Sequence, residues 1–175
     1  MADATRMSQV IDIVLPAVAR ERTILVCSAV SGCTDALIAI GAETDAERRA
    51  QQIETLRRRH HGMARRLFTG AERREMTEEL DGLFAELSAA PGEDCVTFGE
   101  LFSTRILARK FACEGVATQW LDSRELVRTL GGVVAEGLTY AKILSAVDGA
   151  PDCRLFVAPG FIASDGDGRV TTLGR

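Results

Sequence analysis

The sequence has few histidines, few aromatic residues and no paired cysteines. Its 175 residues include only two histidines, His60 and His61, which are neighbours on an expected helix. Adjacent helical side chains point about 100° apart, so these two cannot easily share a metal ion. The five cysteines form no C-x-x-C pair. Neither a metal site nor a disulfide framework is therefore predicted.

Long apolar runs and an excess of one charge are also missing. No stretch approaches the roughly 18 apolar residues of a membrane span. Asp3, Arg6 and Asp12 interrupt the N-terminal segment, where a secretory signal needs an apolar core. The 21 basic and 25 acidic residues leave a formal charge of −4, which is too small to favour an electrostatic nucleic-acid binder. We expect a cytoplasmic protein that binds neither nucleic acid nor membranes.

The hydrophobic patterning predicts a single α/β domain. Short apolar runs typical of buried parallel strands alternate with helical stripes of apolar residues at three- and four-residue spacing. Strands are expected at 23–28, 116–122 and 154–159, and helices at 3–20, 35–42, 45–87, 96–115 and 139–147, with a break in the long helical region at Thr69 and Gly70. This order predicts a three-layer α/β/α sandwich with a mainly parallel sheet.

One basic stretch allows two interpretations. RRRHHGMARR could form a patch for phosphate or nucleic acid, but five acidic residues follow within the next helix. We favour a solvated helix face with ion pairs.

Three loops follow the predicted strands and are candidates for a ligand site, because ligands gather at the carboxyl ends of parallel strands. They are SAVSGCTD, LDSRE and PGFIASDGDGR. In the first, Ser28, Ser31 and Thr34 surround Gly32 at a strand-to-helix turn, where hydroxyls and backbone amides can hold an anion. A simple helix cap would explain the same residues. Glu100, in the first turn of its helix, is equally compatible with helix-dipole stabilisation alone.

The acidic run DGDG at 165–168 does not fit a calcium loop. Arg169 occupies the fifth ligand position, and Val170 stands where such a loop needs glycine. A hairpin turn is the better interpretation.

Together, three stretches resemble the aspartate kinases of the amino-acid kinase superfamily. SAVSGCTDALIAI, FGELFSTRILARKF and VAPGFIASDGDGRVTTLGR are similar to that family's motifs, in the same order and at similar spacing. The resemblance implies the amino-acid kinase fold and transfer of the ATP γ-phosphoryl group to the β-carboxylate of L-aspartate. That reaction is the first step of lysine, threonine and methionine biosynthesis, and Mg²⁺ serves as its cofactor.

The resemblance also implies roles for five residues. Glu100 would pair with the substrate ammonium and Arg175 with its α-carboxylate, while Ser28 and Thr34 would donate hydrogen bonds to the substrate. Phe161 would form a wall of the pocket. It implies no catalytic side chain and no protein-held metal within this chain, and a parent protein that is a homo-oligomer.

The family's first strand, K-F-G-G-T-S-V, and its G-G-S-D segment after L-G-R have no counterpart here. We therefore expect residues 1–175 to be the aspartate-binding part of a kinase domain, with the first strand and the nucleotide-binding half absent, and to be inactive alone. Met1 stands where the family usually has valine, which suggests a truncated reading frame. Two alternatives remain, namely a noncatalytic amino-acid-binding α/β module and another kinase of the superfamily.

Overall fold

A computed structural model describes residues 3–173 of the chain. Its regular elements are helices and short strands, with an uninterrupted run of helices from position 33 to position 113. In chain order they are α1 (Ala4–Arg20), β1 (Thr23–Cys27), α2 (Cys33–Ala42), α3 (Ala46–Leu67), α4 (Gly70–Ala89), the 3₁₀ helix η1 (Gly92–Thr97), α5 (Phe98–Cys113), β2 (Thr118–Trp120), α6 (Ser123–Leu126), β3 (Thr129–Leu130), β4 (Val133–Val134), α7 (Glu136–Asp148), β5 (Leu155–Pro159), β6 (Ile162–Ser164) and β7 (Val170–Thr172).

The central sheet has three parallel strands in the order β1-β5-β2. All five residues of the middle strand β5 are buried, because helices cover both of its faces. Two small antiparallel pairs, β3–β4 and β6–β7, lie outside this sheet. The α/β class and the parallel sheet predicted from the sequence are confirmed, although the sheet is small.

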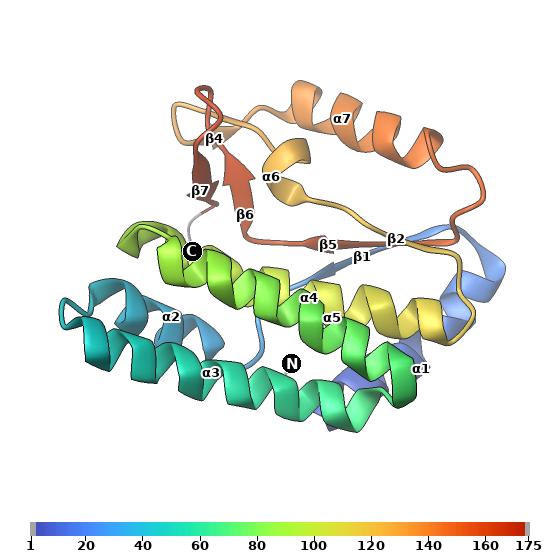
Figure 1. Cartoon of the computed structure of the whole chain (residues 1–175). Helices are drawn as coiled ribbons and strands as arrows, with labels where there is room; N and C mark the ends of the chain where they lie inside the picture. The colour runs from blue at the N-terminus through green and yellow to red at the C-terminus, as the bar shows by residue number, and fades with distance from the viewer. Residues whose placement is uncertain (1–2, 174–175) are drawn as a thin grey trace.

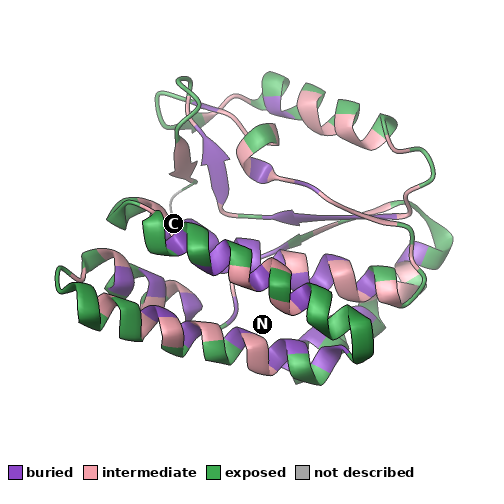
Figure 2. Ribbon diagram, viewed as in Figure 1, coloured by how far each residue is buried: buried purple, intermediate pink, exposed green. Residues whose placement is uncertain are grey.

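Helices lie on both faces of the sheet (Figure 1). One face carries α6 and α7, and the opposite face carries α1 and α5, with α2, α3 and α4 packed beyond them. The main core lies on the α5 side, where 11 of the 16 residues of α5 are buried. Figure 2 shows this burial concentrated along α5 and β5. Helix α5 is therefore the structural centre, and its first turn is held rigidly.

Strand β1 forms an edge of the sheet and is only partly covered. Ile24 and Val26 are 47% and 60% exposed. In the parallel register they lie beside Phe156 and Ala158, which α7 and its flanking loops cover. The helical layer on this face therefore shields β5 and β2 but leaves two apolar side chains of β1 open to solvent.

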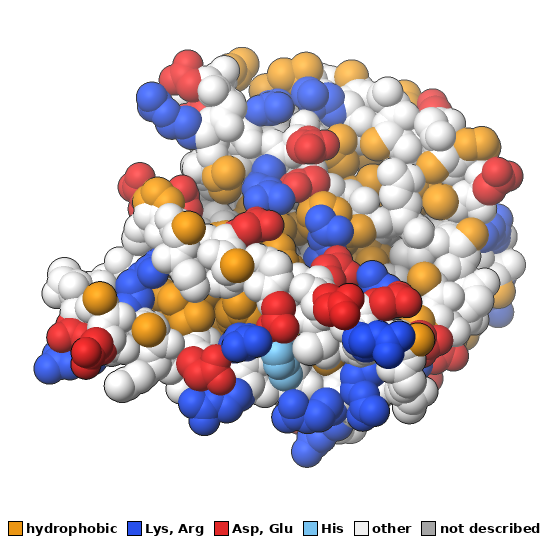
Figure 3. Space-filling view, in the orientation of Figure 1, with side chains coloured by type: hydrophobic (Ala, Val, Ile, Leu, Met, Phe, Trp, Pro, Cys, Tyr) orange, Lys and Arg blue, Asp and Glu red, His pale blue; other side chains and the backbone are white. Residues whose placement is uncertain are grey.

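The basic stretch in α3 forms ion pairs with acidic residues. Arg57 lies 2.8 Å from Asp81 of α4, and Arg58 lies 3.1 Å from Glu54 within α3. Figure 3 shows basic and acidic side chains interspersed over this part of the surface. The structure thus favours the solvated face over a phosphate patch.

The sequence analysis missed several short elements, including η1, α6 and the β3–β4 pair. It also placed the start of α7 three residues late, at 139 instead of Glu136. None of the helices in residues 3–173 has the length and apolar character needed to cross a membrane.

Candidate functional site

Glu100 lies in the first turn of α5 and is only 4% exposed. Its Oε2 atom accepts a hydrogen bond of 2.7 Å from the backbone N–H of Phe161, in the turn between β5 and β6. Two residues from separate predicted motifs, 61 positions apart, are therefore in direct contact. The carboxylate sits at the carboxyl end of the central strand β5, where parallel sheets commonly place ligands.

Two opposing effects act on the Glu100 carboxyl group. Burial, the larger effect, raises its pKa, and contacts with the backbone amides of Phe161, Gly160 and Ile162 lower it in part. The net pKa lies above the usual value. Within residues 3–173, no lysine, arginine or histidine side chain forms an ion pair with Glu100. The site therefore contains a buried acid without a cationic partner from the described chain.

The turn after β1 is tied to the same helix. Ser103, one turn beyond Glu100 and fully buried, has its hydroxyl 3.0 Å from the carbonyl oxygen of Ser28 and 3.2 Å from that of Glu100. The Ser28 side chain itself is exposed. Ser103 thus fixes the Ser28 backbone relative to Glu100 while leaving the Ser28 hydroxyl open to solvent.

Thr34 lies in the first turn of α2, directly after this loop. Gly32 precedes the helix with a φ of 72°, a left-handed conformation that favours glycine. No side chain caps the helix, and the Cys33 amide instead donates a 2.9 Å hydrogen bond to the carbonyl oxygen of Val30. Arg59 of α3 donates a 2.7 Å hydrogen bond to the carbonyl oxygen of Ser31 and holds the turn from outside. The Thr34 side chain is half-buried.

The second predicted loop, 121–125, has a structural role. Asp122 caps α6 through the amide of Arg124 and also pairs with the Arg124 guanidinium at 2.6 Å. Ser123 donates a 2.6 Å hydrogen bond to the carbonyl oxygen of Pro159, at the end of β5. This loop therefore meets the end of β5, and its Asp122 and Arg124 side chains neutralise each other.

The β6–β7 hairpin brings the C-terminal segment to Phe161. Asp165 accepts hydrogen bonds from the amides of Asp167 and Arg169, both of 2.9 Å, as expected for a hairpin turn. Leu173, the last described residue, donates a 2.8 Å hydrogen bond to the carbonyl oxygen of Phe161. Arg175, the predicted partner of a substrate carboxylate, lies outside the described residues.

Sequence reasoning missed the supporting polar side chains of α5 and β2. The Trp120 indole donates a 2.9 Å hydrogen bond to the Thr104 hydroxyl, which in turn donates one of 2.6 Å to the carbonyl oxygen of Glu100. The Arg105 guanidinium lies 3.6 Å from the centre of the Trp120 ring. The sequence shows the two hydroxyl residues of the FST triplet at 102–104, but their partners lie in distant segments that only the fold brings close.

Neither a metal centre nor an activated thiol emerges from these residues. No three His, Cys, Asp or Glu side chains between positions 3 and 173 cluster in a way that could hold a metal ion. Burial raises the pKa of Cys27 to about 11 and that of Cys33 to about 12, so both remain protonated at neutral pH. The described residues at this edge of the sheet instead present one buried carboxylate, an exposed Ser28 side chain and the first turn of α2.

Comparisons with known proteins point to one enzyme group. No protein-family model matches the chain. Lysine-sensitive aspartokinase 3 of Escherichia coli (strain K12) is 29% identical to it over 187 residues, which covers 100% of this chain and 41% of that protein. The crystal structure of E. coli aspartokinase III with lysine and aspartate (T-state) matches with a TM-score of 0.85 and 26% identity, over 99% of this chain and 41% of that one. The R-state structure of that enzyme with aspartate and ADP matches with a TM-score of 0.79 and 27% identity, again over 99% of this chain and 41% of that one. The chain thus spans about two fifths of the length of these relatives.

Proposed function

We propose, from its homology to E. coli aspartokinase III in sequence and in fold, that this chain is the aspartate-binding part of an aspartate kinase. The parent enzyme would transfer the γ-phosphoryl group of ATP to the β-carboxylate of L-aspartate. Residues 1–175 would supply the amino-acid site, and the nucleotide would be held mainly by a part of the enzyme that this chain does not span.

The unpaired buried carboxylate of Glu100 carries this proposal. A buried charge is costly unless it has a partner of opposite sign, and the described residues provide none. The ammonium group of an amino acid would supply that partner, and its approach would lower the pKa of Glu100 toward the usual range. The polarity of the site therefore fits an amino acid better than a simple dicarboxylate.

The other residues assigned to the site come from the turn after β1, the first turn of α2, the β5–β6 turn and the C-terminal segment. We assign the Ser28 hydroxyl and Thr34, in the first turn of α2, to hydrogen bonds with substrate carboxylate oxygens. Phe161 would form a wall, since its backbone already contacts Glu100. Arg175 would bind the α-carboxylate; it follows Leu173, whose amide contacts Phe161, by only two positions.

The reaction needs little acid–base chemistry from the protein. The β-carboxylate of aspartate, with a pKa near 3.9, is already ionised at neutral pH and is itself the nucleophile. Positioning and charge neutralisation must then lower the barrier. ATP and Mg²⁺ are the implied co-substrate and cofactor. The described residues form no acidic cluster for Mg²⁺, so these residues are assigned only to binding and orienting aspartate.

Calorimetric titration of the 175-residue chain with L-aspartate and with succinate tests the assignment. Succinate keeps both carboxylates but lacks the ammonium group, so aspartate should bind more tightly. Glu100→Gln should weaken aspartate binding about 10- to 100-fold, as for a lost charge-assisted hydrogen bond, and leave succinate binding nearly unchanged. Glu78→Gln, at an exposed position of α4, is the control and should change neither.

Equal binding of aspartate and succinate would refute the role of Glu100. With ATP and Mg²⁺ present, trapping of aspartyl phosphate by hydroxylamine should give no signal from this chain alone. A signal would show that the chain holds the nucleotide as well, contrary to the proposed division.

A further inference from the structure

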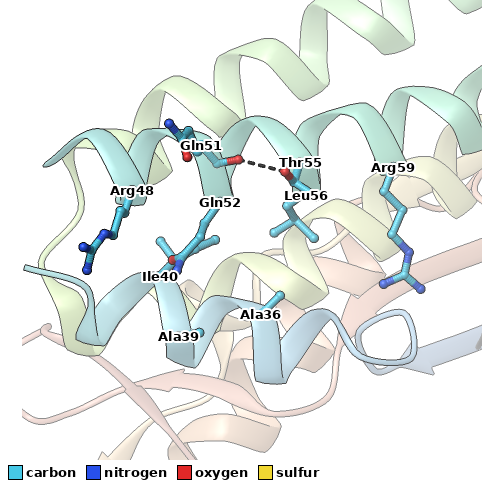
Figure 4. Close-up of a pocket in the computed structure, with 9 residues that line it drawn as sticks. All are labelled: Ala36, Ala39, Ile40, Arg48, Gln51, Gln52, Thr55, Leu56 and Arg59. Carbon is cyan, nitrogen blue, oxygen red and sulfur yellow. Dashed lines mark hydrogen bonds between the residues drawn. The ribbon is translucent and has the colours of Figure 1, made fainter. Parts of the chain in front are cut away.

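A groove between α2 and α3, separate from the Glu100 cluster, has the features of a second ligand site. It has a volume of about 570 Å³, within the range of small-molecule sites. Figure 4 shows the side chains of Arg48, Gln52, Leu56 and Arg59 descending from α3 toward Ala36, Ala39 and Ile40 of α2. On α3, four-residue spacing places Arg48, Gln52 and Leu56 on one face of the helix.

The walls of the groove are apolar and narrow. Ala36 and Ala39 project only methyl groups, which leaves space between the two helices. The floor is formed by Ile40 and Leu56, which are 0% and 4% exposed. The groove therefore offers an aliphatic ligand the two alanine methyl groups and the exposed edge of Leu56, while Ile40 lies beneath them.

Its polar groups favour an anion. None of the nine lining residues is acidic, and two, Arg48 and Arg59, are permanently charged. Arg59 already binds the Ser31 carbonyl oxygen at one end. The Arg48 guanidinium, at the other end, forms no hydrogen bond or ion pair with any side chain or carbonyl in residues 3–173 and is exposed. An incoming carboxylate could bind Arg48 without displacing an existing partner.

Gln52 adds a second requirement. Its side-chain oxygen is buried and has no hydrogen-bond partner, which is unfavourable for a polar atom. It lies one helical turn from Arg48 and points toward Ile40 (Figure 4). Rotation of the Gln52 side chain would bring this oxygen to the groove surface, where a ligand with an N–H or O–H donor close to its carboxylate would satisfy it. A neutral donor suits the groove better than an ammonium group, because no acidic side chain lines it.

We propose that the α2–α3 groove binds a small aliphatic carboxylate that carries a neutral hydrogen-bond donor next to the carboxylate, such as an N-acyl amino acid or a 2-hydroxy acid. The carboxylate contacts Arg48, the donor contacts the Gln52 oxygen, and the aliphatic body packs between the two alanines and Leu56. This site is distinct from the proposed aspartate site, which is zwitterion-selective and centred on Glu100.

N-acetyl-L-leucine is a suitable probe, since it combines all three features. It should bind the 175-residue chain with a dissociation constant on the order of 1 mM, as expected for a ligand of this size. NMR titration of the labelled chain should shift amide signals of residues 36–40 and 48–59. N-acetyl-L-leucinamide, which lacks the charge, and 4-methylpentanoate, which lacks the donor, should each bind at least about fivefold more weakly.

Two variants and a matched control separate the contributions. Arg48→Gln should weaken binding of N-acetyl-L-leucine about tenfold, and Ala39→Trp, at an exposed position, should abolish it by filling the groove. Arg65→Gln changes an exposed arginine of the same helix outside the groove and should have no effect. Circular dichroism melting confirms that each variant is folded.

The proposal would be overturned if the NMR amide signals showed no saturable shifts at N-acetyl-L-leucine concentrations up to 10 times the expected dissociation constant. Equal binding of the acid and its amide, or binding that survives Ala39→Trp in a folded protein, would also overturn it. Because aspartate titration reports on the other site, failure here leaves the aspartate assignment unaffected, and the reverse also holds.

Discussion

Protonation of His60 should make the chain sensitive to acid. His60 is fully buried among Phe84 and Phe102, and its Nδ1 atom lies 2.9 Å from the Leu56 carbonyl oxygen. Its Nε2 atom is buried without a partner. Burial lowers the pKa of this histidine from 6.5 to about 4. The imidazole is therefore neutral in the folded protein over a pH range in which the unfolded chain binds a proton.

The sign and size of the effect follow from this difference. Above pH 6.5 His60 is neutral in the folded and unfolded states, so its titration does not change the free energy of unfolding. As the pH falls from 6.5 to about 4, only the unfolded chain takes up the proton, so folding stability is lost. Each pKa unit corresponds to about 1.4 kcal/mol, so the full loss amounts to about 3 kcal/mol.

Urea unfolding at several pH values between 7.5 and 4 can measure this loss. His60→Phe and His60→Gln both remove the titrating group but differ in polarity and packing. Their stabilities should differ from each other by a constant amount, whereas the wild-type protein should lose about 3 kcal/mol relative to either as the pH falls. If the difference between wild type and both variants stays constant with pH, His60 is not neutral and buried as described, and the reasoning fails.

Two further predictions concern packing around the site. Gly41 of α2 lies against the backbone of Gly92 in η1, and a Cβ atom at position 41 would overlap the Gly92 carbonyl oxygen. Gly41→Ala should therefore lower the free energy of unfolding, measured by urea titration, by about 1–3 kcal/mol. Gly82→Ala, with open space around it, is the control and should not lower it. Ser103→Ala should lower the free energy of unfolding by about 1 kcal/mol and also loosen the Ser28 turn, so the affinity for aspartate should fall several-fold. Ser88→Ala removes a similar helix-backbone hydrogen bond in α4 and should leave the affinity for aspartate unchanged. Equal affinities of the two serine variants would contradict a positioning role for Ser103.

The main elements could be predicted because their patterns depend on local spacing. The apolar stripe of α1 and the continuous apolar run of β5 reflect burial on one face and on both faces, which the sequence encodes directly. The apolar run of β1 predicted the strand but not its exposure, because Ile24 and Val26 are uncovered at the sheet edge. The short pairs β3–β4 and the helix η1 have no such periodicity. Their conformations depend on contacts with distant parts of the chain, which no local pattern shows.

The sequence could nominate residues for the candidate site but could not predict their contacts. The sequence drew attention to Ser28, Thr34, Glu100 and Phe161, through loops at strand ends and through the resemblance to aspartate kinases. It gave no indication that the Phe161 amide binds the Glu100 carboxylate, because this bond joins residues 61 positions apart. Nor did it identify Ser103 or Thr104, whose hydroxyls look like ordinary helix residues until their partners are known.

The chain of hydrogen bonds from Trp120 through Thr104 to the Glu100 backbone has a practical consequence. Trp120 is the single tryptophan of the sequence, so all tryptophan emission comes from this position. Its ring stacks against the Arg105 guanidinium and is linked through Thr104 to the first turn of α5. A shift in its fluorescence would report events at the base of that helix without any added dye. Trp120 is therefore an intrinsic fluorescence probe close to the helix turn that carries the Glu100 carboxylate, on which the proposed function depends.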